Sequence, residues 1–299
     1  MRLDDIRESD YVEDRRGQGG LGGGGVGIPI GRGGGLGFGT MIVLGLISYA
    51  LGIDPRILIG GAEVVSNMGG SRQTQQSQPA GPPPNDETGK FLRRIMALNE
   101  DVWTKILPDQ GGVQFKPPTL VIFSRATRSG CGGAQAAMGP FYCPVDQKLY
   151  LDTSFFDEMK RQLGGGGQFA YAYVVGHEVG HHIQNQLGLL PKVQNAQRSM
   201  SQAQGNALQV RVELQADCYA GVWAHHADQA YRVIQPGDVD QAINTAAAIG
   251  DDKLQQQSQG YVVPESFTHG SSEQRKQWFM QGLKNGTLAA CDTFKRSAS

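Results

Sequence analysis

The chain has 299 residues, with 27 Lys and Arg against 28 Asp and Glu, and a formal net charge of −1 at pH 7. This balance argues against a general nucleic-acid-binding protein, which usually carries a marked basic excess. The length suffices for one sizeable catalytic domain with additional segments, and much of the Gly lies before residue 40 and in 164–167, which indicates a globular part joined to a tail.

The first segment mixes charged residues with Gly. Residues 1–35 show almost no apolar periodicity, so the sequence predicts a disordered tail. No charged residue occurs from Gly33 to Ile53, and about 20 such residues suffice to cross a bilayer, which predicts a transmembrane helix over 36–54. The late start and the lack of a nearby small-residue cleavage site favour an uncleaved anchor over a signal peptide. A buried core helix is the alternative.

Positive charges predict the orientation of this anchor. Before it lie Arg2, Arg7, Arg15, Arg16 and Arg32, whereas Arg56 is the only one that follows shortly after it. The positive-inside rule then places the tail in the cytoplasm and the bulk of the chain outside, where disulfides form. Residues 66–89 are polar and rich in Pro and Gln, so we expect a flexible linker over 55–89 that leads to a globular domain over 90–299.

The beginning of this domain predicts one helix and a small sheet. Apolar side chains recur with helical spacing at Phe91, Ile95, Leu98, Val102 and Ile106. Residues 119–123 are mostly β-branched or aromatic and predict a strand. Residues 141–143 and 148–151 predict a hairpin that turns at 144–147.

The four cysteines are Cys131, Cys143, Cys218 and Cys291. They contain no Cys-x-x-Cys pair, which disfavours a cysteine zinc site. Two disulfides are possible, with three ways of pairing them, and four buried thiols are the alternative. Cys131 with Cys143 is the simplest pair because it closes a short Gly-rich loop. Cys218 with Cys291 would then tie the end of the chain to the predicted helix that bears Glu213.

The pattern His-Glu-x-x-His occurs at His177, Glu178 and His181. On a helix, residues four apart share one face, so the two imidazoles can bind one zinc ion while Glu178 serves as general base for a water molecule. The neighbouring stretch is free of Pro and charge, which supports a helix. Gly176 and Gly180 each cost roughly 1 kcal/mol of helix propensity against Ala, which is easier to understand if something approaches this helix closely.

A third ligand is predicted by the pattern Glu-x-x-x-Asp at Glu213 and Asp217. It lies within a helical pattern from about Ala207 to Ala227, so the two carboxylates are one turn apart. Glu213 would bind the metal, and Asp217 could accept a hydrogen bond from the far ring nitrogen of a histidine ligand and fix its tautomer. The alternative is that both are solvated or paired with Arg211.

The runs from Gly176 to Gln184 and from Val212 to Gly221 resemble the bacterial putative neutral zinc metallopeptidase family, the YpfJ-like proteins, and the resemblance extends over the whole chain. It implies a zincin-like α+β fold, mostly helical with a small sheet beside the active-site helix, a bound Zn²⁺, and a Glu as third ligand. For a bacterial protein, the predicted anchor would lie in the inner or plasma membrane. Its N-terminus would be cytoplasmic and its catalytic domain extracytoplasmic, which is the periplasm in a Gram-negative cell.

Residues Thr268 to Arg275 look like a loop that leads into a helix, and they resemble the His-Pro-x-x-x-x-Arg element of membrane zinc peptidases. The resemblance implies that His269 stabilises the oxyanion of the reaction, although Gly270 stands where Pro is usual. The alternative is a helix-capping or surface histidine. Tyr173 and Tyr219 are other possible donors.

Together these features predict a membrane-anchored zinc metalloendopeptidase. Its substrate would be a peptide or protein. Two alternatives stay open, a catalytically inactive metal-binding scaffold tethered to the membrane and a zinc hydrolase of non-peptide bonds. The neighbouring residue His182 points roughly 100° away from His181 on a helix and is not expected to bind the metal, and His225 and His226 are expected on a helix surface.

Overall fold

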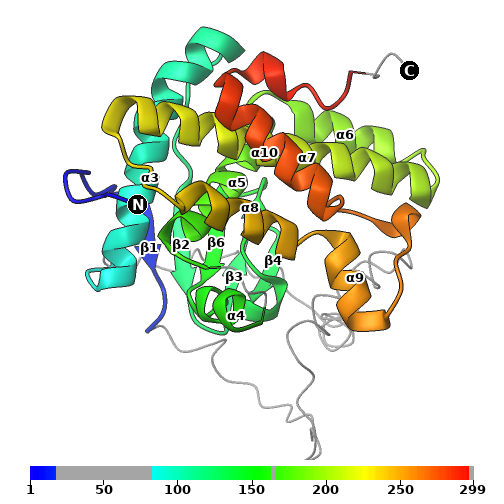
Figure 1. Ribbon diagram of the computed structural model, residues 1–299, viewed down its shortest axis with the longest axis horizontal. Helices are drawn as coiled ribbons and strands as arrows, with labels where there is room; N and C mark the ends of the chain where they lie inside the picture. Colours follow the sequence, from blue (N-terminus) through cyan, green and yellow to red (C-terminus); the bar gives the residue numbers. More distant parts are fainter. Residues whose placement is uncertain (18–82, 163–165, 296–299) are drawn as a thin grey trace, which may run out of the picture.

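The computed structural model describes residues 1–17, 83–162 and 166–295 (Figure 1). The described helices are α3 (Glu87–Ile106), α4 (Ser154–Gln162), α5 (Gln168–Gln186), α6 (Leu189–Gln197), α7 (Gln202–Tyr231), α8 (Asp238–Ala248), α9 (Asp251–Gln259) and α10 (Ser272–Asn285). Short helical turns occur at Leu107–Gly111, Ala136–Met138, Pro264–Ser266 and Leu288–Cys291. The fold is therefore α+β and mostly helical, as predicted.

The main sheet has four strands in the order β1-β2-β6-β5. These strands are β1 (Val12–Asp14), β2 (Thr119–Phe123), β5 (Phe141–Cys143) and β6 (Lys148–Asp152). β1 and β6 both pair with β2 in parallel, and β5 pairs with β6 antiparallel, which confirms the predicted strand and hairpin. A separate two-stranded antiparallel sheet contains β3 (Ala126–Ser129) and β4 (Gly132–Gln135).

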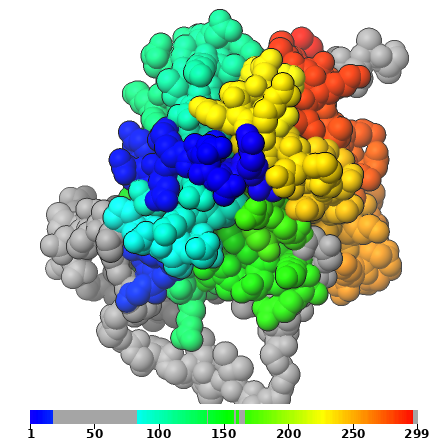
Figure 2. Space-filling model, turned by 60° about the vertical axis from the view of Figure 1, so that its left-hand side comes forward, coloured from blue at the N-terminus to red at the C-terminus, as the bar shows by residue number. Residues whose placement is uncertain are grey.

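The N-terminal residues are part of this fold, so the prediction of a disordered tail over 1–35 is wrong for residues 1–17. Leu3, Ile6 and Val12 are buried, and Figure 2 shows the segment lying across α3. Backbone hydrogen bonds join Arg2 to Val233 at 2.9 Å and Arg15 to Ile122 at 2.7 Å. The apolar residues of this segment are few and far apart, and they become a core only beside partners from distant parts of the chain.

This packing limits how the chain can be oriented in a membrane. β1 is hydrogen-bonded to β2, so residues 1–17 belong to the same folded body as residues 83–162 and 166–295 and lie on the same side of any membrane. A single crossing between them, with a cytoplasmic N-terminus and an extracytoplasmic domain, is incompatible with that pairing. The predicted span over 36–54 and most of the linker lie outside the described residues. Within the described ranges, no helix has the length and apolar character needed to cross a bilayer.

The predicted helix at the start of the domain is α3, which begins at Glu87, slightly before the predicted boundary at 90. Asp86 caps it, because its Oδ1 accepts a hydrogen bond from the N–H of Gly89 at 2.8 Å. The buried side of α3, including Leu92, Ile95 and Trp103, contributes to the main hydrophobic core.

The helices α5 and α7 approach each other closely, which explains the glycines of α5. A Cβ atom on Gly180 would lie 2.9 Å from the carbonyl oxygen of Ala216, closer than packed atoms allow. On another face of α7, a Cβ on Gly282 of α10 would lie 1.9 Å from the carbonyl oxygen of Cys218. α7 is therefore held tightly between the predicted metal-binding helix and α10.

Both predicted disulfides are present. Cys131 is bonded to Cys143 and Cys218 to Cys291, which excludes the alternative of four free thiols. The first closes the loop that contains β4, and the second fastens the C-terminal helical turn to α7.

Candidate metal centre

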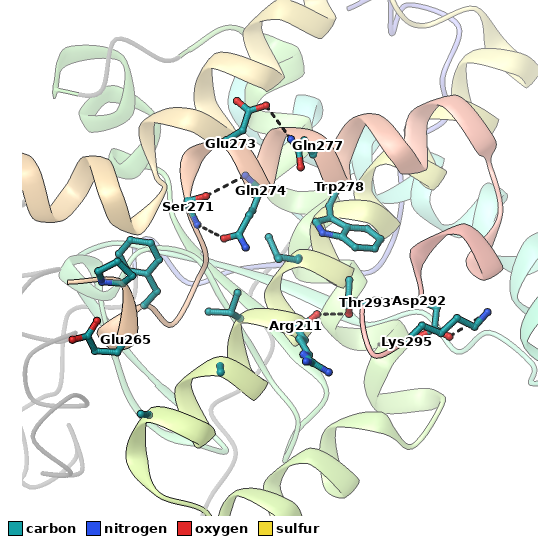
Figure 3. Close-up of a pocket in the computed structure, with 16 residues that line it drawn as sticks. Arg211, Glu265, Ser271, Glu273, Gln274, Gln277, Trp278, Asp292, Thr293 and Lys295 are labelled. Atoms are coloured by element: carbon teal, nitrogen blue, oxygen red, sulfur yellow. Dashed lines mark hydrogen bonds and ion pairs between the residues drawn. The ribbon is translucent and has the colours of Figure 1, made fainter. Parts of the chain in front are cut away.

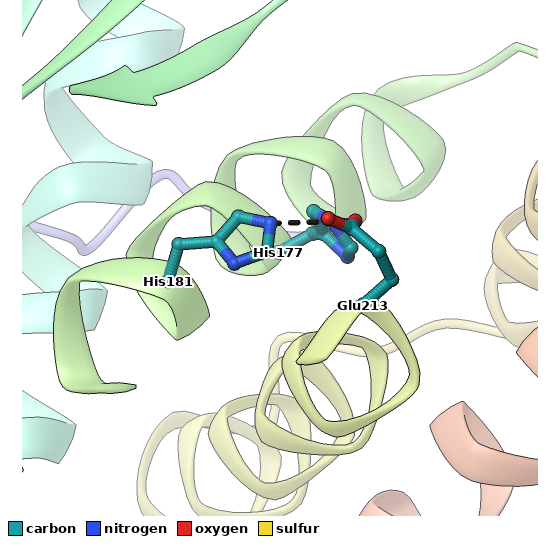
Figure 4. Close-up of side chains that lie close together, drawn as sticks. All are labelled: His177, His181 and Glu213. Atoms are coloured by element: carbon teal, nitrogen blue, oxygen red, sulfur yellow. Dashed lines mark hydrogen bonds and ion pairs between the residues drawn. The ribbon is translucent and has the colours of Figure 1, made fainter. Parts of the chain in front are cut away.

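Three side chains converge between α5 and α7 (Figure 4). The Nε2 atoms of His177 and His181 lie 3.2 and 3.4 Å from Oε2 of Glu213. One ligand atom from each residue lies within 4.8 Å of the others. The helical spacing of His177 and His181 and the close crossing of α7 therefore bring the three predicted ligands together.

The donor set fits a zinc ion. Two imidazole nitrogens and one carboxylate oxygen are a ligand set found in catalytic zinc sites, which keep a fourth position for water or substrate. His177 uses its other ring nitrogen, Nδ1, for a 2.7 Å contact with Oδ1 of Asp217. This contact, which the sequence predicted for a histidine ligand, leaves Nε2 of His177 for the metal.

Asp217 is fully buried and bound from several sides. Arg275 of α10 donates from Nε to Oδ2 and from Nη2 to Oδ1, both at 2.9 Å. The hydroxyl of Tyr173 donates to Oδ1 at 2.6 Å. A buried chain of contacts therefore runs from Arg275 through Asp217 to the imidazole of His177.

This chain sets the charges of its members. Burial by itself raises the pKa of Asp217, but Arg275 and His177 outweigh it and lower that pKa to about 2. Burial lowers the pKa of His177, and the charge and hydrogen bond of Asp217 outweigh it and raise the pKa to about 10. In the metal-free protein both groups are therefore charged at neutral pH, and zinc must displace a proton from His177.

The other two predicted ligands also have supporting contacts. Nδ1 of His181 lies 2.9 Å from Oε1 of Gln184, whose Nε2 donates to the carbonyl oxygen of Val212 at 2.8 Å. Gln209 donates from Nε2 to Oε1 of Glu213 at 2.9 Å. Neither glutamine was predicted as part of the site, although each lies one helical turn from a predicted ligand.

Glu178 lies next to this cluster and is partly exposed. Burial raises the pKa of its carboxyl group, and the charge of Glu213 acts in the same direction, whereas His177 and His181 oppose it. A carboxylate with a raised pKa is a better proton acceptor, which is the property that a general base needs.

His269 lies in the loop between α9 and α10. Its Nδ1 is 3.2 Å from Oδ1 of Asp251, and its side chain is 39% exposed. Burial lowers the pKa of His269, but the hydrogen bond and charge of Asp251 and the charge of Glu213 outweigh it and raise the pKa above its ordinary value. The alternative donors fit less well, because the hydroxyl of Tyr173 is bound to Asp217 and Tyr219 is buried against Trp103.

The remaining histidines are outside the cluster. His182 is buried and contacts the hydroxyl of Tyr142 on β5 at 3.0 Å and the carbonyl oxygen of Lys116 at 2.6 Å. Its place opposite the ligands agrees with the prediction, and it fastens α5 to the edge strand of the sheet. His225 and His226 are partly buried instead of exposed, because they contact carbonyl oxygens at the C-terminal end of α10.

A pocket of about 1410 Å³ is lined by residues of α7, α10 and the loop before α10 (Figure 3), and none of the three predicted ligands is among its lining residues. Its wall includes Val210 and Leu214 of α7, Trp278 of α10 and Phe267 of the preceding loop. Val210 and Leu214 lie near Glu213 in sequence, but Glu213 itself is not part of this wall.

The chain was compared with known proteins. A family model described as "Putative neutral zinc metallopeptidase" matches residues 1–294. "Uncharacterized protein YpfJ" of Escherichia coli K12 is 46% identical over 300 residues, which cover 99% of this chain and 100% of that protein. "Uncharacterized protein Rv2575" of Mycobacterium tuberculosis H37Rv is 42% identical over 222 residues, which cover 70% of this chain and 72% of that protein. No solved structure matches. On the family model and the full-length relative, the chain belongs to the putative neutral zinc metallopeptidase family.

Proposed function

We propose that this protein is a zinc-dependent endopeptidase that uses His177, His181 and Glu213 as zinc ligands and Glu178 as general base. The observation that carries the proposal is the convergence of three ligand atoms within 4.8 Å, next to a carboxylate whose pKa is raised. The family supports the same class of reaction.

Zinc, when bound, polarises the scissile carbonyl and lowers the pKa of a water molecule towards ~7. Glu178 accepts a proton from the attacking water at its carboxylate and then delivers it to the nitrogen of the leaving amine. Asp217 holds the Nδ1 proton of His177 and keeps that ring in its ligand orientation. His269 donates a hydrogen bond to the oxyanion that forms on the carbonyl oxygen.

The substitution Glu178→Gln tests the mechanism. The amide keeps nearly the same shape but cannot accept the proton, so we expect wild-type zinc content and a loss of roughly 10²- to 10⁴-fold in kcat. The measurement is cleavage of fluorescein-labelled casein beside zinc analysis of the same samples. If the variant cleaves as fast as the wild type, Glu178 is not the general base. If the wild type itself does not cleave casein, the alternative of a catalytically inactive metal-binding scaffold is favoured.

The ligand set has its own test. His177→Ala and Glu213→Ala should each lose most of the bound zinc, whereas His226→Ala should retain it, because His226 lies outside the cluster. Undiminished zinc in either ligand variant would contradict the assignment.

We further propose that the folded part of the chain works in an oxidising compartment outside the cytoplasm. Two disulfides support this location. Membrane attachment through residues 36–54 stays a prediction, and it is constrained because residues 1–17 share one fold with residues 83–162 and 166–295. Any membrane contact of the intervening segment has to begin and end on the same side.

A further inference from the structure

Asp251 binds the loop that carries His269. It is the first residue of α9 and is 1% exposed. Its Oδ2 accepts hydrogen bonds from three consecutive backbone N–H groups, those of Thr268 at 2.7 Å, His269 at 2.6 Å and Gly270 at 3.0 Å. Its Oδ1 faces Nδ1 of the His269 ring at 3.2 Å. One carboxylate therefore holds both the backbone and the side chain of this histidine.

The contact between α9 and the loop is reciprocal. The N–H of Asp251 donates to the carbonyl oxygen of Gly270 at 3.0 Å. The next residue, Asp252, accepts hydrogen bonds from the backbone N–H and the hydroxyl of Ser272, both at 2.7 Å. A Cβ atom on Gly250 would lie 2.4 Å from the nitrogen of Ser272. The beginning of α9 is thus fitted closely to the beginning of α10.

Within the described part of the chain, the ring of His269 is held through its Nδ1 side. Nδ1 contacts Asp251 and also lies 3.1 Å from the hydroxyl of Thr268. The atom that can contact a substrate is therefore Nε2, on the other side of the ring. The other charged groups that influence this ring are Glu213 of α7 and Arg275 of α10. Asp251 is the one whose carboxylate contacts the ring itself, and it lies on an element that carries none of the proposed ligands.

We propose that Asp251 is a positioning residue, which fixes the direction of His269 and stabilises its doubly protonated ring, in which Nδ1–H donates to Asp251 and Nε2–H can donate to the substrate oxyanion. This inference rests on the proposed function, in which His269 is that donor. A carboxylate that binds the far nitrogen of a working imidazole orients the ring and stabilises its protonated form.

Histidine-labelled protein tests the contact without any hydrolysis. NMR spectra of the zinc-loaded wild type, Asp251→Asn and the matched control Asp252→Asn are recorded across pH, with His269→Gln to assign the signal. We expect the titration midpoint of His269 to fall by about one pH unit or more in Asp251→Asn and to stay near the wild-type value in Asp252→Asn. An unchanged midpoint in Asp251→Asn would overturn the proposal.

If Asp251→Asn does not fold, the spectrum of the wild type tests the contact between Asp251 and His269 instead. A proton on Nδ1 of His269 that persists in the neutral ring supports the contact with Asp251. A neutral ring whose proton is on Nε2 would overturn it.

The kinetic test uses fluorescein-labelled casein. Asp251→Asn should lower kcat roughly tenfold or more, by the scale expected of an oxyanion donor, while KM changes little. In a His269→Ala background the same substitution should cost nothing further. An equal loss of kcat in both backgrounds would show that Asp251 does not act through His269, and it would overturn the proposal. If the wild type does not cleave casein, the proposed function fails, and the NMR result still decides whether Asp251 positions His269.

Discussion

Arg275 and Asp217 form a buried pair that contacts His177, one of the proposed metal ligands. The guanidinium contacts both oxygens of a carboxylate that also binds His177. Removing one partner of a buried pair costs more than the pair contributes, because the remaining charge has lost both water and its partner. Asp217 therefore depends on a residue 58 positions away in the chain.

We predict that Arg275→Gln lowers the free energy of unfolding of the metal-free protein by roughly 3–5 kcal/mol and weakens zinc binding by about 10- to 100-fold. Urea denaturation and zinc titration measure the two effects. The control is Lys276→Gln, whose partner Glu273 is 66% exposed, so its loss should cost less than about 1 kcal/mol. Equal effects of both substitutions would contradict the role of Arg275.

His182 should make stability depend on pH. Burial lowers its pKa to about 4, while the unfolded chain has a value near 6.5. Between these values the unfolded state binds more protons, so the free energy of unfolding falls as the pH falls. The loss from this group is roughly 3 kcal/mol, complete near pH 4 and absent above about pH 7.

Urea denaturation of the metal-free protein at several pH values measures this dependence. His182→Gln should show a shallower dependence than the wild type, and His226→Gln, which leaves His182 in place, should follow the wild type. If His182→Gln keeps the full wild-type dependence, other groups cause it.

The residues of the site differ in how far the sequence could reveal them. The sequence alone could identify four candidate residues, because their helical spacings have a chemical meaning. They are His177, Glu178, His181 and Glu213. Asp251 could not, since it lies in no motif and acts through hydrogen bonds to a loop 17 to 19 residues away.

The departure at Gly270 from the usual His-Pro pattern has a structural explanation. Gly270 has a φ of 91° and donates its N–H to Asp251. Proline has a φ near −65° and no N–H, so it could do neither. In this chain the carboxylate of Asp251 supplies the restraint on the loop.

At the scale of elements, α7 combines several structural roles. It carries Glu213 and Asp217, crosses α5 at Gly180, and is bonded through Cys218 to the C-terminal turn. The long helices could be predicted because their apolar periodicity extends over many residues. β1 was missed because it has only three residues and a distant partner, and β4 was missed because Gly132 and Gly133 give it no alternation of apolar side chains.

The two disulfides should differ in their effect on stability. Cys218 and Cys291 are 73 residues apart and Cys131 and Cys143 only 12, so loop entropy gives about 4 and about 3 kcal/mol respectively. We predict that the double substitution of Cys218 and Cys291 by Ser lowers the free energy of unfolding more than that of Cys131 and Cys143. The substitution of Cys218 and Cys291 should also weaken zinc binding, because Cys218 follows Asp217 directly. The reverse order in urea denaturation would contradict this.

At the scale of the whole molecule, the position of the N-terminal residues limits how the chain can meet a membrane. Asp10 has a 95% exposed side chain and Val145 is 72% exposed, so cysteines at these sites can report where each part lies. We predict that Asp10→Cys and Val145→Cys behave alike toward a membrane-impermeant maleimide applied to intact spheroplasts. Labelling of only one of them would show that the two parts are on opposite sides and that the pairing of β1 with β2 does not form in the cell.

The parallel pairing of β1 also has a consequence for biosynthesis. Arg15, at the end of this strand, contacts Thr127, which is 112 residues further along the chain. At the usual rate of about 5–20 residues per second, the ribosome needs roughly 6 to 22 s to make that stretch. During this interval the earliest-made strand has an unsatisfied edge, which is open to chaperones and to other nascent chains, so completion of the sheet is a late event of folding.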